Sequence, residues 1–260
     1  MGYFSLPDIT TRSFKVWLRN RDVFVSSFKV NFLPPLVEPI LYLFALGFGL
    51  GNYITDIEGI SYAEFIAPAL IATSVMFAGF YECTFGSYVR MYYQKTFDAI
   101  IATPLNIDEV IAGELFWGAT RSVINSIIVL PVMAAFGLIV FPHSLLIIPF
   151  AFLAGLLFSC IAMCFTAVTP NINSLTYPSI LFITPMFLFS GTFFPLSLLP
   201  QTVQYFALAT LPLAHIVIVI RSLASGILDV SILFSLVWMI VVTAILFLLS
   251  INLMKKKLVI

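Results

Sequence analysis

Residues 144–168, SLLIIPFAFLAGLLFSCIAMCFTAV, decide the fold class. They carry no charged side chain, and the run is longer than the roughly 20 apolar residues that one helical membrane crossing needs. The charge-free region extends from Arg121 to Arg221, so it must hold several crossings. Only 9% of the 260 residues are charged and 61% are hydrophobic, whereas about 25% are charged in an average soluble domain. The chain is therefore predicted to be an all-α integral membrane protein.

The basic residues set the predicted orientation. Lys and Arg cluster near the start of the chain and at residues 255–257, and cytoplasmic segments carry an excess of these residues. Both termini are therefore expected in the cytoplasm, which requires an even number of crossings of a cell membrane (inner or cytoplasmic). Six spans are predicted, at residues 30–50, 62–89, 110–141, 144–168, 172–194 and 230–254.

A seventh apolar region, residues 195–226, is not expected to cross. It carries Pro195, Pro200 and Pro212, and irregular backbone at membrane depth is tolerated where protein buries it. We predict a pair of re-entrant external helices between the fifth and sixth spans.

The N-terminal region has the pattern of a helix that lies in the membrane interface. Within residues 5–28, apolar side chains alternate with basic ones at helical spacing, which favours an amphipathic helix on the cytoplasmic side. Pro34 and Pro35 are then expected to break or redirect the chain before the first span, because proline removes a helix hydrogen bond.

Residues 91–114, MYYQKTFDAIIATPLNIDEVIAGE, interrupt the apolar pattern between the second and third predicted spans. Phe97, Ile100 and Ile101 form an apolar stripe beside polar residues, and Thr103–Pro104 ends the turn. A short amphipathic helix is predicted within residues 91–109. Periodicity alone leaves two interpretations open: a solvated connection between two spans, or a docking surface for a soluble partner.

This segment also carries a family resemblance. KTFDAIIATPLNIDEVIAGE, residues 95–114, resembles the cytoplasmic loop of ABC-2 type exporter permeases, with Asp98 where Glu is commoner. Further similar segments cover most of the chain, and together they are most similar to the nodulation-factor branch of that superfamily. They are EPILYLFALGFGLG at 38–51, ISYAEFIAPALIATSVMFAGFYE at 60–82, ITPMFLFSGTFFPLSLLP at 183–200 and LPLAHIVIVIRSLASG at 211–226.

The resemblance implies a single ABC-2 transmembrane domain over residues 1–260 that pairs with a second permease copy. Each half would grip one ATP-binding cassette subunit, two copies in all. The residues implied in this coupling are Gln94, Lys95, Thr96, Phe97, Asp98, Thr103 and Pro104. Because the chain lacks a GxxxxGK[ST] phosphate loop, ATP and Mg²⁺ are expected on the partner and no cofactor on this chain. Whether the second permease is identical or a related chain stays open.

Three ionisable residues, Glu38, Glu82 and Arg121, fall inside predicted spans. A charge at the centre of a membrane helix costs about 2.5–3.5 kcal/mol on insertion scales, so these side chains should pair or face the bundle. Counted from the cytoplasmic ends at about 1.5 Å per residue, they reach similar depths. Arg121 is therefore expected to bridge Glu38 and Glu82, either as a buried strut or as a polar lining that contacts a substrate headgroup.

Other candidates rest on residue type. Phe187, Phe193 and Phe194 are the expected lining of an exit path, because aromatic faces stack on sugars and pack on acyl chains. His215 is a candidate ligand for an anionic headgroup. Core packing is the competing interpretation for each of them. No catalytic or metal site is expected, and Cys160 and Cys164 are interpreted as packing residues.

These observations favour the permease subunit of an ATP-driven exporter that moves an amphipathic substrate such as a lipo-oligosaccharide or lipid-linked glycan. An exporter of drugs or small hydrophobic compounds is the alternative within the superfamily. A proton-coupled secondary transporter, with Glu38 and Glu82 as carriers, is the alternative outside it. Membrane enzymes are disfavoured because His, Asp and Arg do not cluster as such sites require. Membrane lipids are expected partners, and nucleic acid is not.

Overall fold

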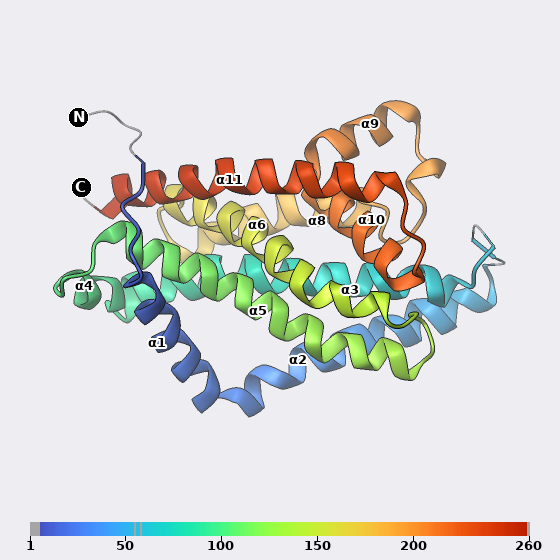
Figure 1. Cartoon of the computed structure of the whole chain (residues 1–260), viewed down its shortest axis with the longest axis horizontal. Helices are drawn as coiled ribbons and strands as arrows, with labels where there is room; N and C mark the ends of the chain where they lie inside the picture. The colour runs from blue at the N-terminus through green and yellow to red at the C-terminus, as the bar shows by residue number, and fades with distance from the viewer. Residues whose placement is uncertain (1–5, 55, 58, 259–260) are drawn as a thin grey trace.

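A computed structural model describes residues 6–54, 56, 57 and 59–258, which carry helices α1 to α11 and no β-strand. Most of the long helices run along one common direction, and both termini lie at the same end of the molecule as α4 (Figure 1). The predicted all-α membrane fold is confirmed. Residues 1–5, 259 and 260, which the predicted domain includes, lie outside the described residues.

The chain changes direction at Ser27, not at the Pro34–Pro35 pair. Helix α1 (Ser13–Ser26) ends there and α2 (Phe28–Tyr42) begins. Both prolines lie inside α2, which continues through a π-helical turn at Leu43–Gly49 as far as Asn52. The expected break is therefore wrong. In a membrane-spanning helix, neighbouring helices and local adjustments of helical pitch compensate for the hydrogen bonds that proline removes.

The next two spans begin at well-formed caps. Ser61 and Glu64 form a capping box that starts α3 (Tyr62–Tyr81), and Asn106 and Glu109 form another that starts α5 (Ile107–Ala135). Helix α3 continues through π-helical turns as far as Tyr93. The short α4 (Thr96–Ile101) lies between these two spans.

The second half contains two long helices and several short ones. The long helices are α6 (Ile147–Val168) and α11 (Val230–Leu258). Between them lie α7 (Thr176–Pro178), α8 (Thr184–Phe189), α9 (Gln201–Thr210) and α10 (Pro212–Ser225). Helices α9 and α10 meet at 92°, and both lie toward the end of the molecule that is opposite the termini (Figure 1).

Six helical segments of the described chain are long and apolar enough to cross a membrane, in agreement with the predicted number. Their bounds differ from those predicted. The third span runs over Ile107–Ala135 rather than 110–141, because the capping box begins it three residues earlier and the helix stops before Gly137. The last helix extends to Leu258, so it includes the lysines expected to follow it.

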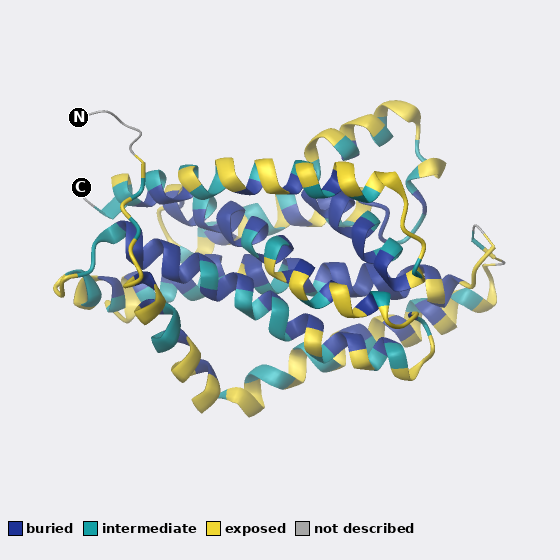
Figure 2. Cartoon of the chain, in the orientation of Figure 1, coloured by how far each residue is buried: buried dark blue, intermediate teal, exposed yellow. Residues whose placement is uncertain are grey.

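Helices α3, α5 and α6 form the core, and the outer helices leave apolar faces uncovered (Figure 2). In the most apolar window of the α3 span 83% of the residues are buried, against 22% in the α2 span and 17% in α11. The core helices approach closely at small residues: a Cβ on Gly79 would lie 2.8 Å from the carbonyl oxygen of Gly155. Close approach at small residues is the usual device for packing helices within a membrane.

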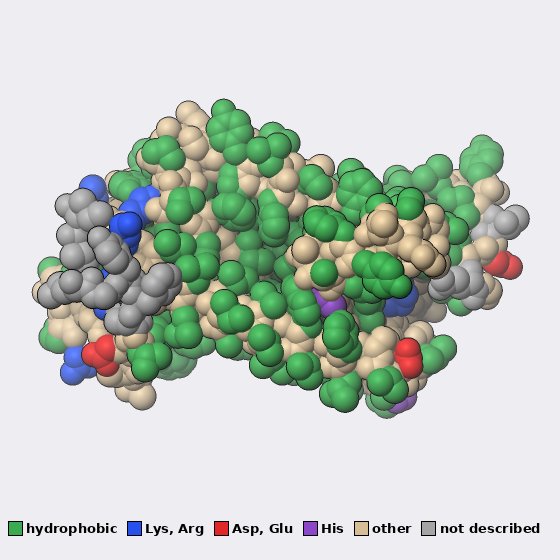
Figure 3. All heavy atoms as spheres, turned by 90° about the horizontal axis from the view of Figure 1, so that it is seen from above, with side chains coloured by type: hydrophobic (Ala, Val, Ile, Leu, Met, Phe, Trp, Pro, Cys, Tyr) green, Lys and Arg blue, Asp and Glu red, His purple; other side chains and the backbone are tan. Residues whose placement is uncertain are grey.

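The surface has the charge distribution of a membrane protein. Seen from above, basic side chains gather at the end that holds the termini, and apolar side chains cover much of the length between the two ends (Figure 3). The uncovered apolar faces of α2 and α11 are therefore the surfaces that lipid or another membrane helix would cover.

Candidate functional site

Helix α4 presents a polar face and is anchored by one aromatic side chain. Lys95 precedes it with φ 55°, a left-handed conformation that turns the chain sharply. The Phe97 side chain is fully buried, while Lys95 and Asp98 are exposed and lie 3.7 Å apart. The amphipathic helix predicted in this segment is therefore present over Thr96–Ile101, shorter than the predicted range of 91–109.

The N-terminal part of the chain contacts the segment between the second and third spans both at the start of α4 and after its end. Arg19 Nη2 donates to Thr96 Oγ1 at 3.3 Å, at the start of α4. Arg12 Nη1 donates to the carbonyl oxygen of Pro104 at 2.8 Å, after its end. Thr103 Oγ1 closes the last turn onto the Ile100 carbonyl at 2.6 Å, and Gln94 is exposed.

The start of α5 is tied to both termini. The backbone nitrogen of Asp8 donates to Asp108 Oδ2 at 3.0 Å, and Lys255 Nζ at the end of α11 donates to the same oxygen at 3.0 Å. Thr10 Oγ1 donates to Glu109. A displacement of α4 would therefore reach the N-terminal segment and α11 through the first turn of α5.

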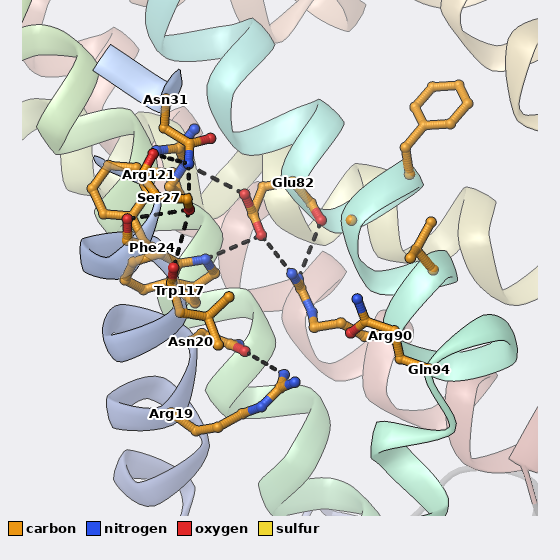
Figure 4. A pocket seen from close by; sticks show the side chains of 14 residues that line it. Arg19, Asn20, Phe24, Ser27, Asn31, Glu82, Arg90, Gln94, Trp117 and Arg121 are labelled. Carbon is orange, nitrogen blue, oxygen red and sulfur yellow. Dashed lines mark hydrogen bonds and ion pairs between the residues drawn. The ribbon is translucent and has the colours of Figure 1, made fainter. Parts of the chain in front are cut away.

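Inside the bundle, four ionisable residues, Glu82, Arg90, Glu114 and Arg121, form what we call the charge cluster. Arg90 Nη1 lies 2.8 Å from Glu82 Oε1, and Arg90 Nη2 lies 2.6 Å from Glu114 Oε2. Arg121 Nε lies 3.3 Å from Glu82 Oε2. Glu82 is thus held between two guanidinium groups, as Figure 4 shows.

Neutral donors complete the charge cluster. Glu114 accepts from Asn20 Nδ2 at 2.7 Å and from Ser87 Oγ at 2.7 Å. Glu82 accepts from Trp117 Nε1 at 3.0 Å. The Glu114 side chain is only 1% exposed and that of Arg90 13%, so these ion pairs stay largely apart from water. They link α3 and its π-helical extension to α5, and the Asn20 hydrogen bond adds α1.

Arg90 and Glu114 were not predicted as members of this cluster, because both lie next to or within the polar segment at residues 91–114. Their spacing carries a signal. Glu82 and Arg90 are eight residues apart, Glu114 and Arg121 seven, and both spacings return close to the same face of a helix with 3.6 residues per turn. The signal was hidden because the predicted second span ended at 89, one residue before Arg90, while the predicted third span began at 110, which put Glu114 close to its cytoplasmic end.

Arg121 does not bridge the two predicted carboxylates. Within the part of the chain that the structure describes it pairs with Glu82 alone, and its guanidinium carbon lies 4.3 Å from the centre of the Phe24 ring on α1. Glu38 forms no ion pair among the described residues. The reason is geometric. Contacts with α3 and α1 fix the Arg121 guanidinium, while Glu38 lies on α2, farther along the wall of a cavity that both residues line.

A polar groove runs beside the charge cluster, between α1 and α2 on one side and α3 and α5 on the other. It consists of two adjoining cavities of about 400 and 450 Å³ that share Asn31, Glu82 and Arg121 in their walls. The first also has Arg19 and Gln94 in its wall, and Figure 4 shows the labelled side chains around it. The second reaches Glu38, and a small hollow beyond it reaches Phe187.

The remaining candidates lie in two different places. The rings of Phe187 and Phe193 meet edge to face at 4.7 Å, and both side chains are half-buried, as is Phe194. Only Phe187 reaches the groove system. His215 is fully buried: its Nε2 lies 2.8 Å from the carbonyl oxygen of Leu208, and its ring stacks on Trp238 at 4.3 Å.

His215 Nδ1 lies 3.1 Å from Ser235 Oγ, so both ring nitrogens have partners within the protein. This geometry supports the packing interpretation of His215 rather than a headgroup contact.

With this geometry established, comparison with known proteins gives the family. The sequence profile of the ABC-2 type transporter family matches residues 9–225 of the 260. The chain belongs to the ABC-2 type transporter family. The matched region holds α1 to α10 and all the site residues that were predicted from the sequence.

Individual relatives of this chain are similar to it over most of its length. Nodulation protein J of Rhizobium meliloti is 35% identical over 211 residues, which cover 81% of this chain and 80% of that protein. Nodulation protein J of Sinorhizobium fredii is 34% identical over 206 residues, 79% and 78% of the two chains. The inner membrane transport permease YadH of Escherichia coli is 25% identical over 189 residues, 71% and 72%.

ABC-2 membership and these relatives support a multi-pass ABC exporter permease. The family implies an ATP-binding cassette partner, and membership is consistent with a multi-pass transport subunit in an inner membrane.

Proposed function

We propose that this chain is the membrane subunit of an ATP-driven exporter and that α4 receives the movement of a separate ATP-binding subunit. The observation that carries the proposal is the construction of α4. Its polar face is exposed while Phe97 is fully buried. A helix that is held by one buried ring, contacted at its start by Arg19 and followed by a turn that Arg12 binds suits a docking element better than a plain connection does.

Movement of α4 would pass to the spans through short, well-bonded links. Only residues 102–106 separate α4 from α5, and the charge cluster joins α5 to α3 through buried ion pairs. Breaking such a pair by removing one partner costs about 3–5 kcal/mol, so α3 and α5 are expected to move together. Packing and ion pairs would thus carry movement from α4 to the membrane spans, and no covalent step on this chain is needed.

The substrate proposed is an amphipathic lipid such as a lipo-oligosaccharide or lipid-linked glycan, moved outward. The relatives named nodulation protein J and the polar groove beside lipid-exposed helices support this choice. An exporter of small hydrophobic compounds would need less polar lining. A proton-driven mechanism through Glu82 is disfavoured because its carboxylate is already bound by Arg90, Arg121 and the Trp117 indole.

Native mass spectrometry of the full chain, co-expressed with the products of the genes that neighbour its own, tests the proposal. Two permease copies with two ATP-binding subunits are expected. Phe97→Ala should reduce the fraction of complex, because α4 loses its buried anchor, whereas Ala99→Ser, at an exposed position of the same helix, should not. A permease that purifies without any ATP-binding subunit, and transports without ATP, would contradict the proposal.

A further inference from the structure

We infer that the polar groove is the headgroup site of the exporter and that it takes a phosphate-like oxyanion carried by an amphipathic lipid, bound through Arg121 and Arg19. This inference rests on the proposed function and names the chemistry of its substrate. The groove lies between α1, α2, α3 and α5. One of its walls is therefore α1, the helix that precedes the first span.

The charges around the first cavity leave one positive charge over. Arg19, Arg90 and Arg121 line its wall together with Glu82, and Glu114 stands behind Arg90. Arg90 is committed to both carboxylates and Arg121 Nε to one of them. Arg19 forms no ion pair with a carboxylate among the described residues. Its hydrogen bonds go to two neutral acceptors, Asn20 Oδ1 and Thr96 Oγ1. A single anion in the first cavity would balance this local excess, because Glu38 lines only the second cavity.

The donors that remain suit an oxyanion. Arg121 Nη1 is buried and has no hydrogen-bond partner among the described residues. Guanidinium groups bind phosphate and carboxylate with paired, charge-assisted hydrogen bonds. Arg121 is therefore held by Glu82 and Phe24, while its buried Nη1 has no partner among the described residues.

The second cavity suits the uncharged part of a headgroup. Ser74 and Asn125 lie in its wall, and Asn125 Oδ1 is a second buried polar atom without a partner in the described chain. Amide and hydroxyl groups of this kind bind sugar or glycerol hydroxyls. Glu38 stands farther along the wall, where its charge would repel an anion and favour a position nearer to Arg19 and Arg121.

Size and surroundings agree with a lipid ligand. Cavities of about 400 and 450 Å³ fall within the range of roughly 300–1,000 Å³ typical of small-molecule sites. On α2, Leu33, Val37 and Leu41 are exposed apolar side chains. A headgroup in the groove would thus leave its acyl chains at the outer face of the same helix, in lipid.

Binding of short-chain lipids to the full chain in detergent tests the inference. The probes are dioctanoyl phosphatidic acid, dioctanoyl phosphatidylcholine and inorganic phosphate, with affinity measured by microscale thermophoresis. We expect phosphatidic acid to bind at least about tenfold more tightly than phosphatidylcholine. Arg19→Gln and Arg121→Gln should each weaken phosphatidic acid about tenfold, the effect expected for one lost hydrogen bond to a charged group. Equal affinity for the two lipids would overturn the inference.

Arg21→Gln is the matched control. Arg21 lies on the same helix as Arg19, but it is exposed and pairs with Asp22 at 2.7 Å, so the preference for phosphatidic acid should persist. An equal loss in Arg21→Gln would overturn the inference, because it would indicate general surface charge. Inorganic phosphate that competes as well as the lipid would also overturn the assignment to a lipid headgroup. Arg19→Gln keeps the test valid if Arg121→Gln fails to fold, since Arg19 lies outside the charge cluster.

The two proposals fail separately. A chain that assembles with its ATP-binding subunit but binds both lipids equally would keep the exporter function and remove the headgroup site. A chain that prefers the anionic lipid but never assembles with an ATP-binding subunit would keep the anion-binding site and remove the exporter function.

Discussion

Arg90 holds the charge cluster together because one guanidinium satisfies two carboxylates. Arg90→Gln would leave Glu114, which is 1% exposed, without its ionic partner. A loss of about 3–5 kcal/mol in unfolding free energy is expected for an orphaned buried charge. Arg90→Lys should recover only part of this loss, since an ammonium cannot form the paired hydrogen bonds of a guanidinium.

Denaturant unfolding of the purified chain in one detergent measures these differences. Lys95→Gln is the control: its ion pair with Asp98 is 3.7 Å long and more than 60% exposed on both sides, so its loss should change stability by no more than about 1 kcal/mol. Wild-type stability in Arg90→Gln would show that the cluster does not stabilise the fold.

At the residue scale, sequence reasoning found half of this cluster. Glu82 and Arg121 stood out because they are isolated charges in apolar runs. Glu114 and Arg90 did not, because a charge near a span end looks the same whether it lies in water or in the bundle. Only the positions of the helix ends, set here by the Asn106 cap and the π-helical extension to Tyr93, decide between the two.

At the scale of elements, α1 depends on one glycine of α5. A Cβ added to Gly113 would lie 2.6 Å from Val16 Cβ and 2.7 Å from the carbonyl oxygen of Ser13. Gly113→Val is therefore expected to push α1 away from α5, at a cost of about 1–3 kcal/mol for overpacking. Because Asn20 on α1 binds Glu114, the displaced helix would also weaken the charge cluster.

Thermal unfolding and limited proteolysis at the α1–α2 junction would register this change as a lower midpoint and faster cleavage. Gly51→Ala is the matched substitution: its nearest neighbour would be Tyr62 Cβ at 3.7 Å, an ordinary contact. If Gly113→Val behaved like Gly51→Ala, the close approach of α1 and α5 would not be needed for stability.

Elements with strong periodicity or strong charge contrast were predictable, and those that depend on helix distortion were not. The six spans and α4 follow from apolar length and amphipathic spacing. The break expected at the prolines of α2 was wrong, because a proline does not end a helix where neighbouring helices pack on the distorted turn. Whether α1 lies in the membrane interface stays a prediction.

For the whole molecule, the open question is whether α9 and α10 form one crossing or none. Counting this pair as a span would give seven crossings and put the termini on opposite sides of the membrane. Both helices lie toward one end of the molecule, while α1 and the C-terminal end of α11 lie toward the other (Figure 1). The bond between Lys255 and Asp108 joins the end of α11 to the start of α5, beside α4. This arrangement favours six crossings and a re-entrant pair.

Cysteine labelling in intact spheroplasts decides between the two topologies. Leu198→Cys lies before α9 and Leu6→Cys in the N-terminal segment, and these leucines are 73% and 86% exposed. Cys83 and Cys160 are buried, and Cys164→Ser would remove the remaining background. A membrane-impermeant maleimide should label Leu198→Cys from outside and reach Leu6→Cys and Lys256→Cys only after permeabilisation. Labelling of only one terminus from outside would require an odd number of crossings, and then α9 and α10 would form a broken span.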